Sequence, residues 1–517
     1  MTRPRPSGPD RGPSPKFLKG DSDRRAGQDS RGKITHNREA GMHTQAGLII
    51  GGESRATGSE GVLEITDPAT DEVLASLPKA GLAEVAEATE AALQSFADWS
   101  AVSPYDRSKV LRRAADLMRA RTEEAARCLT LEQGKPLAQA RIEWASSADL
   151  LDWFAEEGRR AYGRIIAGRV PNADLRVLRK PVGPVAALSP WNFPAWGVMQ
   201  KIAPALAAGC SVVAKPSEAT PVTTWHIAMC LLEAGLPPRA ISVIWGSSSL
   251  ISDALIKSPE IRKVSLTGST RVGRIVAALA GEHLKKVTME LGGHAPVIVA
   301  ADADMSKLIP LAAQWKFRNA GQVCVSPTRF LVEDAVYDDF VDGLAQAAAR
   351  VKVGNGLDES TAMGPLCTRN QRNVISAMVA DARARGARVV AGGDAIGNTG
   401  NFHAPTVVAD AHAGLMAMND EPFGPLALVA RMGSIDEALA EANRMPVGLA
   451  SFAFTSNVHT AARITRTIRA GMLGINHFAL GLPETPFGGI LDSGFGSEGG
   501  IEGLEAYTSP MLVSAMV

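Results

Sequence analysis

The sequence predicts an α/β protein in which a doubly wound parallel sheet is followed by a second α/β domain. From residue 182 onward, short apolar runs alternate with amphipathic helical stretches, as in a parallel sheet that is covered on both faces. The same alternation begins again after residue 293 and continues to about residue 473. The chain has 517 residues, which is too long for one hydrophobic core, so two or three domains are expected.

Charge and cysteine content exclude several classes of protein. The 54 basic and 54 acidic residues balance, so nothing indicates binding to nucleic acid or to a membrane surface. An odd number of cysteines, five, without paired spacing favours a reducing compartment, and we expect a cytoplasmic protein. The nine histidines are scattered and no CxxC occurs, so no metal site is predicted. No apolar run reaches the roughly 18 residues of a membrane helix, so a soluble protein is expected.

The first part of the chain reads as a tail, edge strands and then helices. Residues 1–41 are rich in Pro, Gly, Ser and Arg and nearly free of apolar residues, which predicts a disordered tail. Short apolar runs over 48–77 predict edge strands and turns. Helices are expected over 81–99, from the Ser103-Pro104 start to a stop at Gly134-Lys-Pro136, and from 137 to about 162.

The predicted parallel sheet follows a stretch, 164–179, that alternates as strands do. Its strands are expected at 185–188, 211–214, 241–244 and 263–266, and the helices between them at 194–208, 221–234 and 270–283. Such sheets bind ligands beyond the carboxyl ends of their strands, and Asn192 and Lys215 fall there. In the second domain, strands are expected at 295–299 and 328–333 and helices at 336–351, 370–385 and 434–443.

Cys324 is the candidate nucleophile. A loop of small residues, 319–322, precedes it and a strand-like run follows, so the thiol is expected at a loop edge on a rigid element. A buried structural cysteine is the alternative. Glu290 in Met-Glu-Leu-Gly-Gly and Asn192 in Pro-Trp-Asn-Phe-Pro supply a carboxylate and an amide. Together the three residues make a candidate nucleophile, base and oxyanion donor.

A dinucleotide site is suggested by two segments, although the GxGxxG fingerprint is absent. In the turn 267–273, backbone amides and the Ser269 hydroxyl could hold a pyrophosphate at a helix N-terminus; a plain turn is the alternative. Glu218, in Lys-Pro-Ser-Glu, can accept hydrogen bonds from two ribose hydroxyls and would repel a 2′-phosphate, which favours NAD over NADP. Lys215 could still bind a phosphate, so NADP remains a candidate. The alternative is that Lys215 and Glu218 are a solvent-exposed charge pair without a ligand.

Six motifs occur in a fixed order, PWNFP, KPSE, LTGSTRVG, MELGG, GQVC and EPFGPL, with PFGG after them. From about Leu48 to its end, the chain resembles the NAD(P)-dependent aldehyde dehydrogenases. The resemblance implies a Rossmann-like cofactor domain at 47–163 and 181–292 and a catalytic domain at 293–484. A small β oligomerisation segment is implied at 164–180 and 485–517, in a homodimer or homotetramer. The cofactor contacts that it implies are Trp191, Lys215, Glu218, Gly268, Ser269, Gln371, Glu421 and Phe423.

The implied reaction is oxidation of an aldehyde to an acid. The Cys324 thiolate, if its pKa is lowered, would form a thiohemiacetal whose oxyanion is held by the Asn192 amide and the Cys324 N–H. Loss of hydride would leave a thioester, and Glu290 would activate water to hydrolyse it. A cofactor-independent cysteine esterase is the alternative from another class; a CoA-acylating dehydrogenase and a catalytically inactive structural relative are weaker ones.

The spelling Gly-Gly-His-Ala-Pro, with its His294, and Lys-Phe-Arg-Asn-Ala-Gly-Gln resemble the succinate-semialdehyde branch. In that branch two arginines grip the distal carboxylate. Arg318 matches one of them, whereas Gln200 stands at the position of the other, and Trp196 adds apolar bulk nearby. We therefore expect a semialdehyde substrate such as succinate semialdehyde, with a broad-specificity or aromatic aldehyde dehydrogenase as the alternative. His294 is expected to be a packed histidine.

Overall fold

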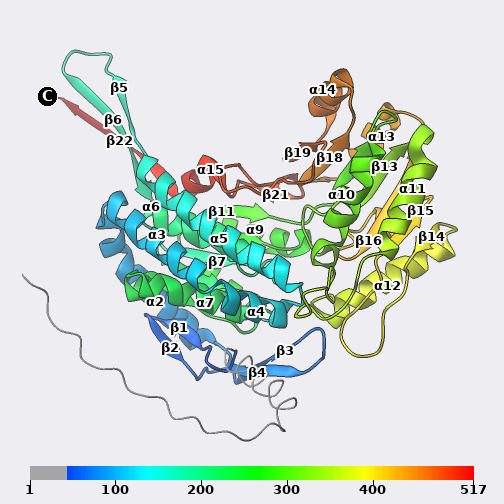
Figure 1. The fold of residues 1–517 in the computed structure, drawn as a ribbon. Helices are drawn as coiled ribbons and strands as arrows, with labels where there is room; N and C mark the ends of the chain where they lie inside the picture. The colour runs from blue at the N-terminus through cyan, green and yellow to red at the C-terminus, as the bar shows by residue number, and fades with distance from the viewer. Residues whose placement is uncertain (1–42, 517) are drawn as a thin grey trace, which may run out of the picture.

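The computed structural model describes residues 43–516, and the predicted tail at 1–41 lies outside them. Two α/β lobes stand side by side in Figure 1, and a thin β ribbon projects from the first. Each lobe is built on one large, mainly parallel sheet with its own apolar core, so the predicted fold class is confirmed. Between residues 43 and 516, no helix has both the length and the apolar content to cross a membrane.

The first sheet has eight strands in the order β2-β1-β9-β8-β7-β10-β11-β21. The five strands from β9 to β11 in this order run parallel. At the edges, β1 pairs antiparallel with β9, β2 antiparallel with β1, and β21 antiparallel with β11. Their bounds are β1 Leu48–Ile50, β2 Glu53–Arg55, β7 Val185–Leu188, β8 Val212–Lys215, β9 Ile241–Val243, β10 Lys263–Thr267, β11 Lys286–Glu290 and β21 Gly494–Phe495. All four strands predicted for this sheet are present within a residue of their expected ends.

Helices cover both faces of the first sheet, as a doubly wound fold requires. One face carries α2, α8 and α9; the other carries α6 and α7, over which α3, α4 and α5 pack. Their bounds are α2 Leu82–Ala101, α3 Pro104–Ala120, α4 Thr122–Gln133, α5 Leu137–Glu157, α6 Trp196–Ala208, α7 Pro221–Glu233, α8 Ser248–Lys257 and α9 Thr270–Glu282. The predicted caps are present, because Ser103 accepts from the Asp106 N–H and Gly134 ends α4 in the left-handed region.

The second sheet has seven strands in the order β14-β15-β16-β13-β12-β18-β19, all parallel except β14. The strands are β12 Pro296–Val299, β13 Arg329–Glu333, β14 Arg388–Ala391, β15 Thr406–Ala409, β16 Leu426–Met432, β18 Ala450–Phe454 and β19 Met472–Ile475. The helices are α10 Met305–Phe317, α11 Asp334–Ala349, α12 Arg369–Ala384, α13 Ile435–Ala442 and α14 Val458–Thr467. Elsewhere, β3 (Val62–Thr66) and β4 (Val73–Pro78) form an antiparallel pair.

The projecting ribbon joins distant parts of the chain. Strand β6 (Ala173–Pro181) pairs on one side with β5 (Arg164–Ala167) and on the other with β22 (Thr508–Met516), both antiparallel. Figure 1 shows β22, in red, lying along β6 out to the C-terminal end. Only the last part of the expected 485–517 segment therefore belongs to the ribbon.

The earlier part of that segment packs on the two lobes instead, which corrects the expected boundary. Strand β21 extends the first sheet beside β11, and β20 (Ile490–Leu491) pairs with β17 (Val447–Gly448). Gly494 explains the first contact, since its φ is +114° and a Cβ there would lie 1.9 Å from the Met289 oxygen. A short helix, α15 (Gly500–Glu505), then leads into the ribbon.

Candidate active site

The loop between α10 and β13 delivers Cys324. Asn319, Ala320 and Gly321 all have positive φ, at 49°, 51° and 72°, so the chain turns in three successive left-handed steps. Only glycine fits at the third position, because a Cβ on Gly321 would lie 2.0 Å from the Gly424 oxygen. The Asn319 amide donates to the Gln322 oxygen at 3.2 Å, and the Gln322 amide donates back to the Asn319 oxygen at 3.0 Å. The turn is thus locked by its own side chains.

Cys324 lies between two pockets that share no other lining residue. Eight of the predicted site residues line the first pocket together with Cys324: Trp191, Asn192, Gly268, Ser269, Glu290, Gln371, Glu421 and Phe423. They come from both lobes, since Glu421 and Phe423 lie between β15 and β16 of the second sheet and Glu290 ends β11 of the first. Asn192 and Phe423, which are 231 positions apart in the chain, therefore meet at one cavity.

The first pocket has the chemistry of a dinucleotide site. Ser269 caps α9 by accepting from the Val272 N–H at 3.3 Å, which leaves its own hydrogen and the helix N-terminus to face an anion. Trp191 and Phe423 meet edge to face, with centroids 5.6 Å apart, and form a wall for a flat ring. The Gln371 amide donates to the Phe423 oxygen at 2.8 Å, so it holds this wall in the structure.

Lys215 and Glu218 do not line this pocket. Lys215 ends β8, is buried, and its ammonium donates to the Ser248 hydroxyl at the start of α8. Burial lowers the pKa of Lys215, while Glu218 acts in the opposite direction. Glu218 is half-buried three residues beyond the strand. Lys215 and Glu218 lie at and just beyond the carboxyl end of β8, the strand next to β7.

Glu290 and Cys324 form the centre of the site. Burial and the neighbouring Glu498 raise the pKa of Glu290 to about 8, against the opposing effect of Lys201. One carboxyl oxygen of Glu290 is buried with no hydrogen-bond partner among the described residues, so it is available to a water or a substrate. Burial likewise raises the pKa of Glu421 to about 8.

The pKa of the Cys324 thiol is shifted in the direction opposite to the lowering that a reactive thiolate would need. Burial, followed by the charge of Glu290, raises the pKa of the thiol well above its ordinary value. The buried site excludes water from the sulfur, and the carboxyl groups of Glu290, Glu421 and Glu498 add to the effect. Burial and these charges therefore disfavour the thiolate form of Cys324 in the free protein.

Asn192 is held from two directions. Its side-chain amide donates to the Gln322 oxygen at 3.1 Å, which leaves its second amide hydrogen for an oxyanion. Its backbone oxygen accepts from Lys135 at 2.8 Å and from the Asn319 amide at 2.9 Å. The predicted oxyanion donor is thereby tied directly to the loop that carries the thiol.

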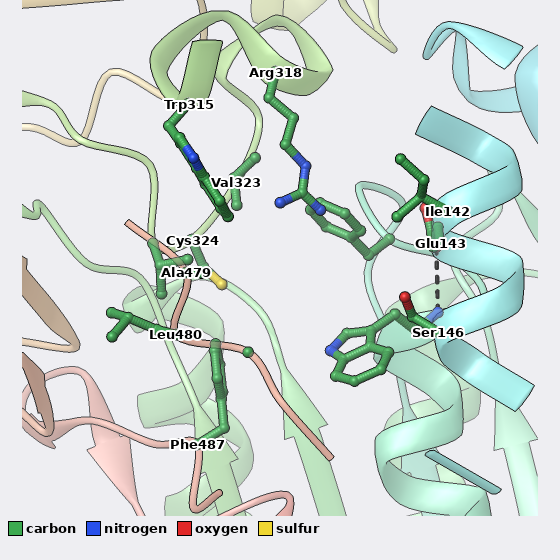
Figure 2. Close-up of a pocket in the computed structure, with 14 residues that line it drawn as sticks. Ile142, Glu143, Ser146, Trp315, Arg318, Val323, Cys324, Ala479, Leu480 and Phe487 are labelled. Atoms are coloured by element: carbon green, nitrogen blue, oxygen red, sulfur yellow. Dashed lines mark hydrogen bonds between the residues drawn. The ribbon is translucent and has the colours of Figure 1, made fainter. Parts of the chain in front are cut away.

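The second pocket opens on the other side of Cys324 (Figure 2). Four aromatic rings line it, those of Phe193, Trp196, Trp315 and Phe487, with further apolar walls from Ile142, Val323 and Leu480. Figure 2 shows the Arg318 side chain reaching past Trp315 into this space, with the Cys324 sulfur below it. Arg318 and Trp196 are thus brought to the thiol as predicted.

The Arg318 guanidinium stacks on aromatic rings. Its central carbon lies 5.2 Å from the Trp315 centroid and 5.4 Å from that of Phe193. Burial lowers the pKa of Arg318, with Glu143 and Cys324 opposing. Between residues 43 and 516, it makes no hydrogen bond or ion pair through this group. A half-buried guanidinium without such a partner has the chemistry to bind an anion.

Gln200 does not reach the pocket. It is 2% exposed and lies one turn beyond Trp196 on α6, and neither polar atom of its side chain has a partner in the described structure. The spacing that aligned it with a substrate arginine places it in the interior of the domain. His294 is packed as expected: its two ring nitrogens bond the Thr328 hydroxyl at 2.7 Å and the Ala417 oxygen at 2.9 Å.

Two buried ion pairs beside the site were missed by the sequence analysis. Lys201 pairs with Glu498, and Lys135 pairs with Glu143. A lysine within the apolar run of α6 was a usable signal for the first pair, because a buried charge needs a partner. Nothing in the sequence pointed to Glu498, which lies 297 positions away.

Taken together, the two parallel-sheet lobes, the dinucleotide pocket and the buried thiol and carboxyl groups define an NAD(P)-dependent oxidoreductase that acts on aldehydes. The chain matches the model of the aldehyde dehydrogenase family over residues 55–513. It belongs to that family, which confirms the resemblance seen in its motifs.

Two curated relatives and one solved structure show how similar the chain is to known members. It is 44% identical over 460 residues to 4-(hydroxymethyl)benzenesulfonate dehydrogenase TsaD1 of Comamonas testosteroni, covering 89% of this chain and 96% of that protein. It is 39% identical to the NADP(+) succinate-semialdehyde dehydrogenase GabD of Escherichia coli K12, covering 91% and 97%. Betaine aldehyde dehydrogenase from Staphylococcus aureus, crystallised with NAD+, superposes with a TM-score of 0.90 at 31% identity, covering 93% and 97%. The predicted use of NAD(P) and the likeness to semialdehyde dehydrogenases are confirmed.

Proposed function

We propose that this enzyme oxidises an aldehyde that carries a distal acidic group to the corresponding carboxylic acid, with NAD as the preferred cofactor. The observation that carries the proposal is the unpaired guanidinium of Arg318 in the wall of the pocket that leads to Cys324. A carboxylate there would gain a charge-assisted, bidentate pair that a neutral aldehyde cannot make. Succinate semialdehyde is the first candidate, because its short chain would join an aldehyde at Cys324 to a carboxylate at Arg318.

The proposed chemistry follows from the positions of three side chains. The proton of the Cys324 thiol passes to solvent, and the sulfur attacks the carbonyl carbon to give a thiohemiacetal. The free amide hydrogen of Asn192 and the Cys324 N–H hold the oxyanion. Bound NAD supplies the acceptor for the hydride that the adduct releases. Glu290 then activates a water, which hydrolyses the thioester on Cys324 and frees the acid.

A second candidate substrate is an aromatic aldehyde with a sulfonate or carboxylate on its ring. The four aromatic rings that line the pocket favour it, since flat rings pack well against such walls. Its support from the relatives is that TsaD1 is named for a benzenesulfonate and another relative, 39% identical, for 3-sulfolactaldehyde. Both anions would pair with Arg318 in the same way as a carboxylate.

The test of the reaction is NADH formation, followed by absorbance, over a panel of aldehydes with NAD and NADP side by side. Aliphatic and aromatic aldehydes with and without an acidic group are compared by kcat/KM. The Cys324→Ala variant is the control, because every covalent route passes through this sulfur. Substantial turnover by that variant would remove Cys324 from the mechanism. Glu218→Gln is expected to narrow the preference for NAD, since it removes the charge that repels a 2′-phosphate.

The domain roles and the assembly are part of the same proposal. Residues 47–163 and 181–292 bind the cofactor, residues 293–484 supply Cys324, and the ribbon joins two copies of the chain. Its exposed apolar residues support the last role, because Ile165, Leu512 and Met516 are 82%, 63% and 72% exposed in the single chain. Sedimentation velocity tests it: an intact chain that stays monomeric at micromolar concentration would exclude a ribbon-mediated dimer.

A further inference from the structure

A buried ion pair contacts the loop that carries Asn192. Lys135, just after α4, pairs with Glu143 on α5, and each side chain is only 1% exposed. The Lys135 ammonium also donates to the backbone oxygen of Asn192 at 2.8 Å and lies 4.1 Å from the centroid of the Phe193 ring. One cation therefore holds both the main chain of the oxyanion residue and the ring that follows it.

Glu143 grips the other end of the same loop. One of its oxygens accepts from the Ala195 N–H at 2.9 Å and from the Trp196 N–H at 3.2 Å, the latter drawn as the dashed line in Figure 2. These N–H groups open α6 and would otherwise be buried without acceptors. A carboxylate is also favourable there because of the helix dipole. The pair thus spans the whole turn from Asn192 to Trp196.

The loop so held forms part of both halves of the site. On one side the Asn192 amide donates to the Gln322 oxygen in the Cys324 loop. On the other side Phe193 and Trp196 are walls of the aldehyde pocket, and Phe193 also lies against Arg318. A buried ion pair is a poor way to stabilise a core, because desolvation offsets most of the attraction. The contacts of Lys135 and Glu143 instead explain the presence of this ion pair, because they fix the geometry of the loop.

We infer that Lys135 and Glu143 are positioning residues for the covalent step: they fix the Asn192 amide relative to the Cys324 loop, and fix the aromatic wall of the aldehyde pocket in the same arrangement. The inference rests on the proposed role of Asn192 as oxyanion donor. Neither residue touches the reacting atoms; they act through the loop between residues 192 and 196.

A double-mutant cycle with Lys135→Met, Asn192→Ala and the combined variant tests the inference. Two rates are measured: the pre-steady-state burst of NADH, and the cofactor-free hydrolysis of p-nitrophenyl acetate, which needs the same oxyanion donor. Lys135→Met is expected to slow both by about 10- to 100-fold, the cost of a donor displaced by a fraction of an ångström to an ångström. The KM for NAD should stay unchanged. If Lys135 acts through Asn192, the combined variant is no slower than Asn192→Ala alone.

Arg107→Met is the matched control for lost stability. Arg107 is a buried cation that donates to the Ala207 oxygen at 3.1 Å, at the opposite end of α6 from Asn192. Its loss should lower the melting temperature as Lys135→Met does, yet leave the burst rate near that of the wild type. Equal slowing by the two variants at equal loss of melting temperature would show a merely structural role and overturn the inference.

Two variants of Glu143 provide a second, independent test of the inference. Glu143→Gln keeps an oxygen acceptor for the two N–H groups of α6, whereas Glu143→Leu removes it, so the glutamine variant should retain clearly more of the burst rate. Identical rates for the two variants would contradict the inference. If the burst rate falls in Asn192→Ala but stays at the wild-type value in Lys135→Met, the inference is overturned and the proposed oxyanion role of Asn192 stands. A wild-type rate for Asn192→Ala overturns the proposed oxyanion role, and the inference with it.

Discussion

Lys201 and Glu498 form a buried ion pair next to Glu290, although they lie on different elements. The Lys201 ammonium also donates to the Thr267 hydroxyl at 2.6 Å, and Thr267 is the residue of β10 that lies opposite Glu290 on β11. The two charges act on Glu290 in opposite directions: Glu498 raises its pKa and Lys201 lowers it. Burial has the largest effect on the pKa of Glu290, and this pair adjusts the pH at which the proposed base works.

Turnover should rise with pH through a value near 8, because only the ionised form of Glu290 can take a proton from water. Lys201→Met removes the charge that favours the carboxylate and should move the kcat profile to higher pH. Glu498→Gln removes the charge that disfavours it and should move the profile to lower pH. The melting temperature is recorded across the same pH range, since breaking a buried pair costs about 3–5 kcal/mol. Shifts in the same direction would contradict the assignment of Glu290.

Glu290→Gln should separate the two halves of the reaction. The first hydride transfer is expected to proceed, while hydrolysis of the thioester slows by about 10²–10⁴ through loss of the general base. Rapid mixing with NAD and aldehyde should then give a burst of one NADH per site followed by little turnover. Cys324→Ala, which cannot form the adduct, should show no burst. A burst slowed as strongly as turnover would mean that Glu290 is required earlier.

Gly321→Ala should damage the active site well beyond ordinary backbone strain. The new Cβ would lie 2.0 Å from the Gly424 oxygen, so the loop before Cys324 has to move. A displacement of about an ångström at the thiol costs about 10² in rate. Gly386→Ala is the matched control: its φ is +85° but no atom lies within 4 Å of the new Cβ. It should lose only about 1–2 kcal/mol of stability, with normal kcat. Equal kcat values for the two variants would show that the loop tolerates the shift.

Arg318→Leu tests how the substrate is recognised. For succinate semialdehyde, kcat/KM should fall about 10- to 100-fold, as expected for loss of a charged hydrogen bond of about 1.5–3 kcal/mol. For butanal, a neutral aldehyde of the same length, it should change little. Arg318→Lys keeps the charge without the planar fork and should lie between the two. If the ratio of kcat/KM for succinate semialdehyde to that for butanal is near one in the wild type and stays there in Arg318→Leu, a carboxylate contact is excluded. The aromatic candidate is then tested with 4-formylbenzenesulfonate.

Local patterns in the sequence predicted the two lobes, and the resemblance to a known family pointed to most of the residues that line the first pocket. Short apolar runs mark buried parallel strands, and motif residues at the carboxyl ends of such strands meet at one edge, as Asn192 and Glu290 do. Contacts between charges far apart in the chain have no local signal, so the partner of Lys201, which lies 297 positions away, could not be found. Spacing also misplaced Gln200, because a helix position alone does not decide which side chain reaches a cavity.

The raised pKa of the Cys324 thiol also could not be predicted from the sequence. It depends first on the burial of Cys324 once both lobes are in place, and then on the carboxyl groups of Glu290, Glu421 and Glu498 around it. The same holds for β21, whose pairing with β11 depends on a single glycine that admits the neighbouring chain. In each case the deciding quantity is a through-space distance between segments far apart in the chain.

Cys324 is the one lining residue common to the two pockets, and this makes the preference for an aldehyde a separable property of the enzyme. Replacing Trp196, Trp315 or Phe487 reshapes the acyl side alone, whereas the walls that face the dinucleotide keep their form. New substrates can therefore be acquired in small steps without re-evolving the redox half of the protein. A directed-evolution campaign confined to those three rings can change what is oxidised while the oxidant stays the same.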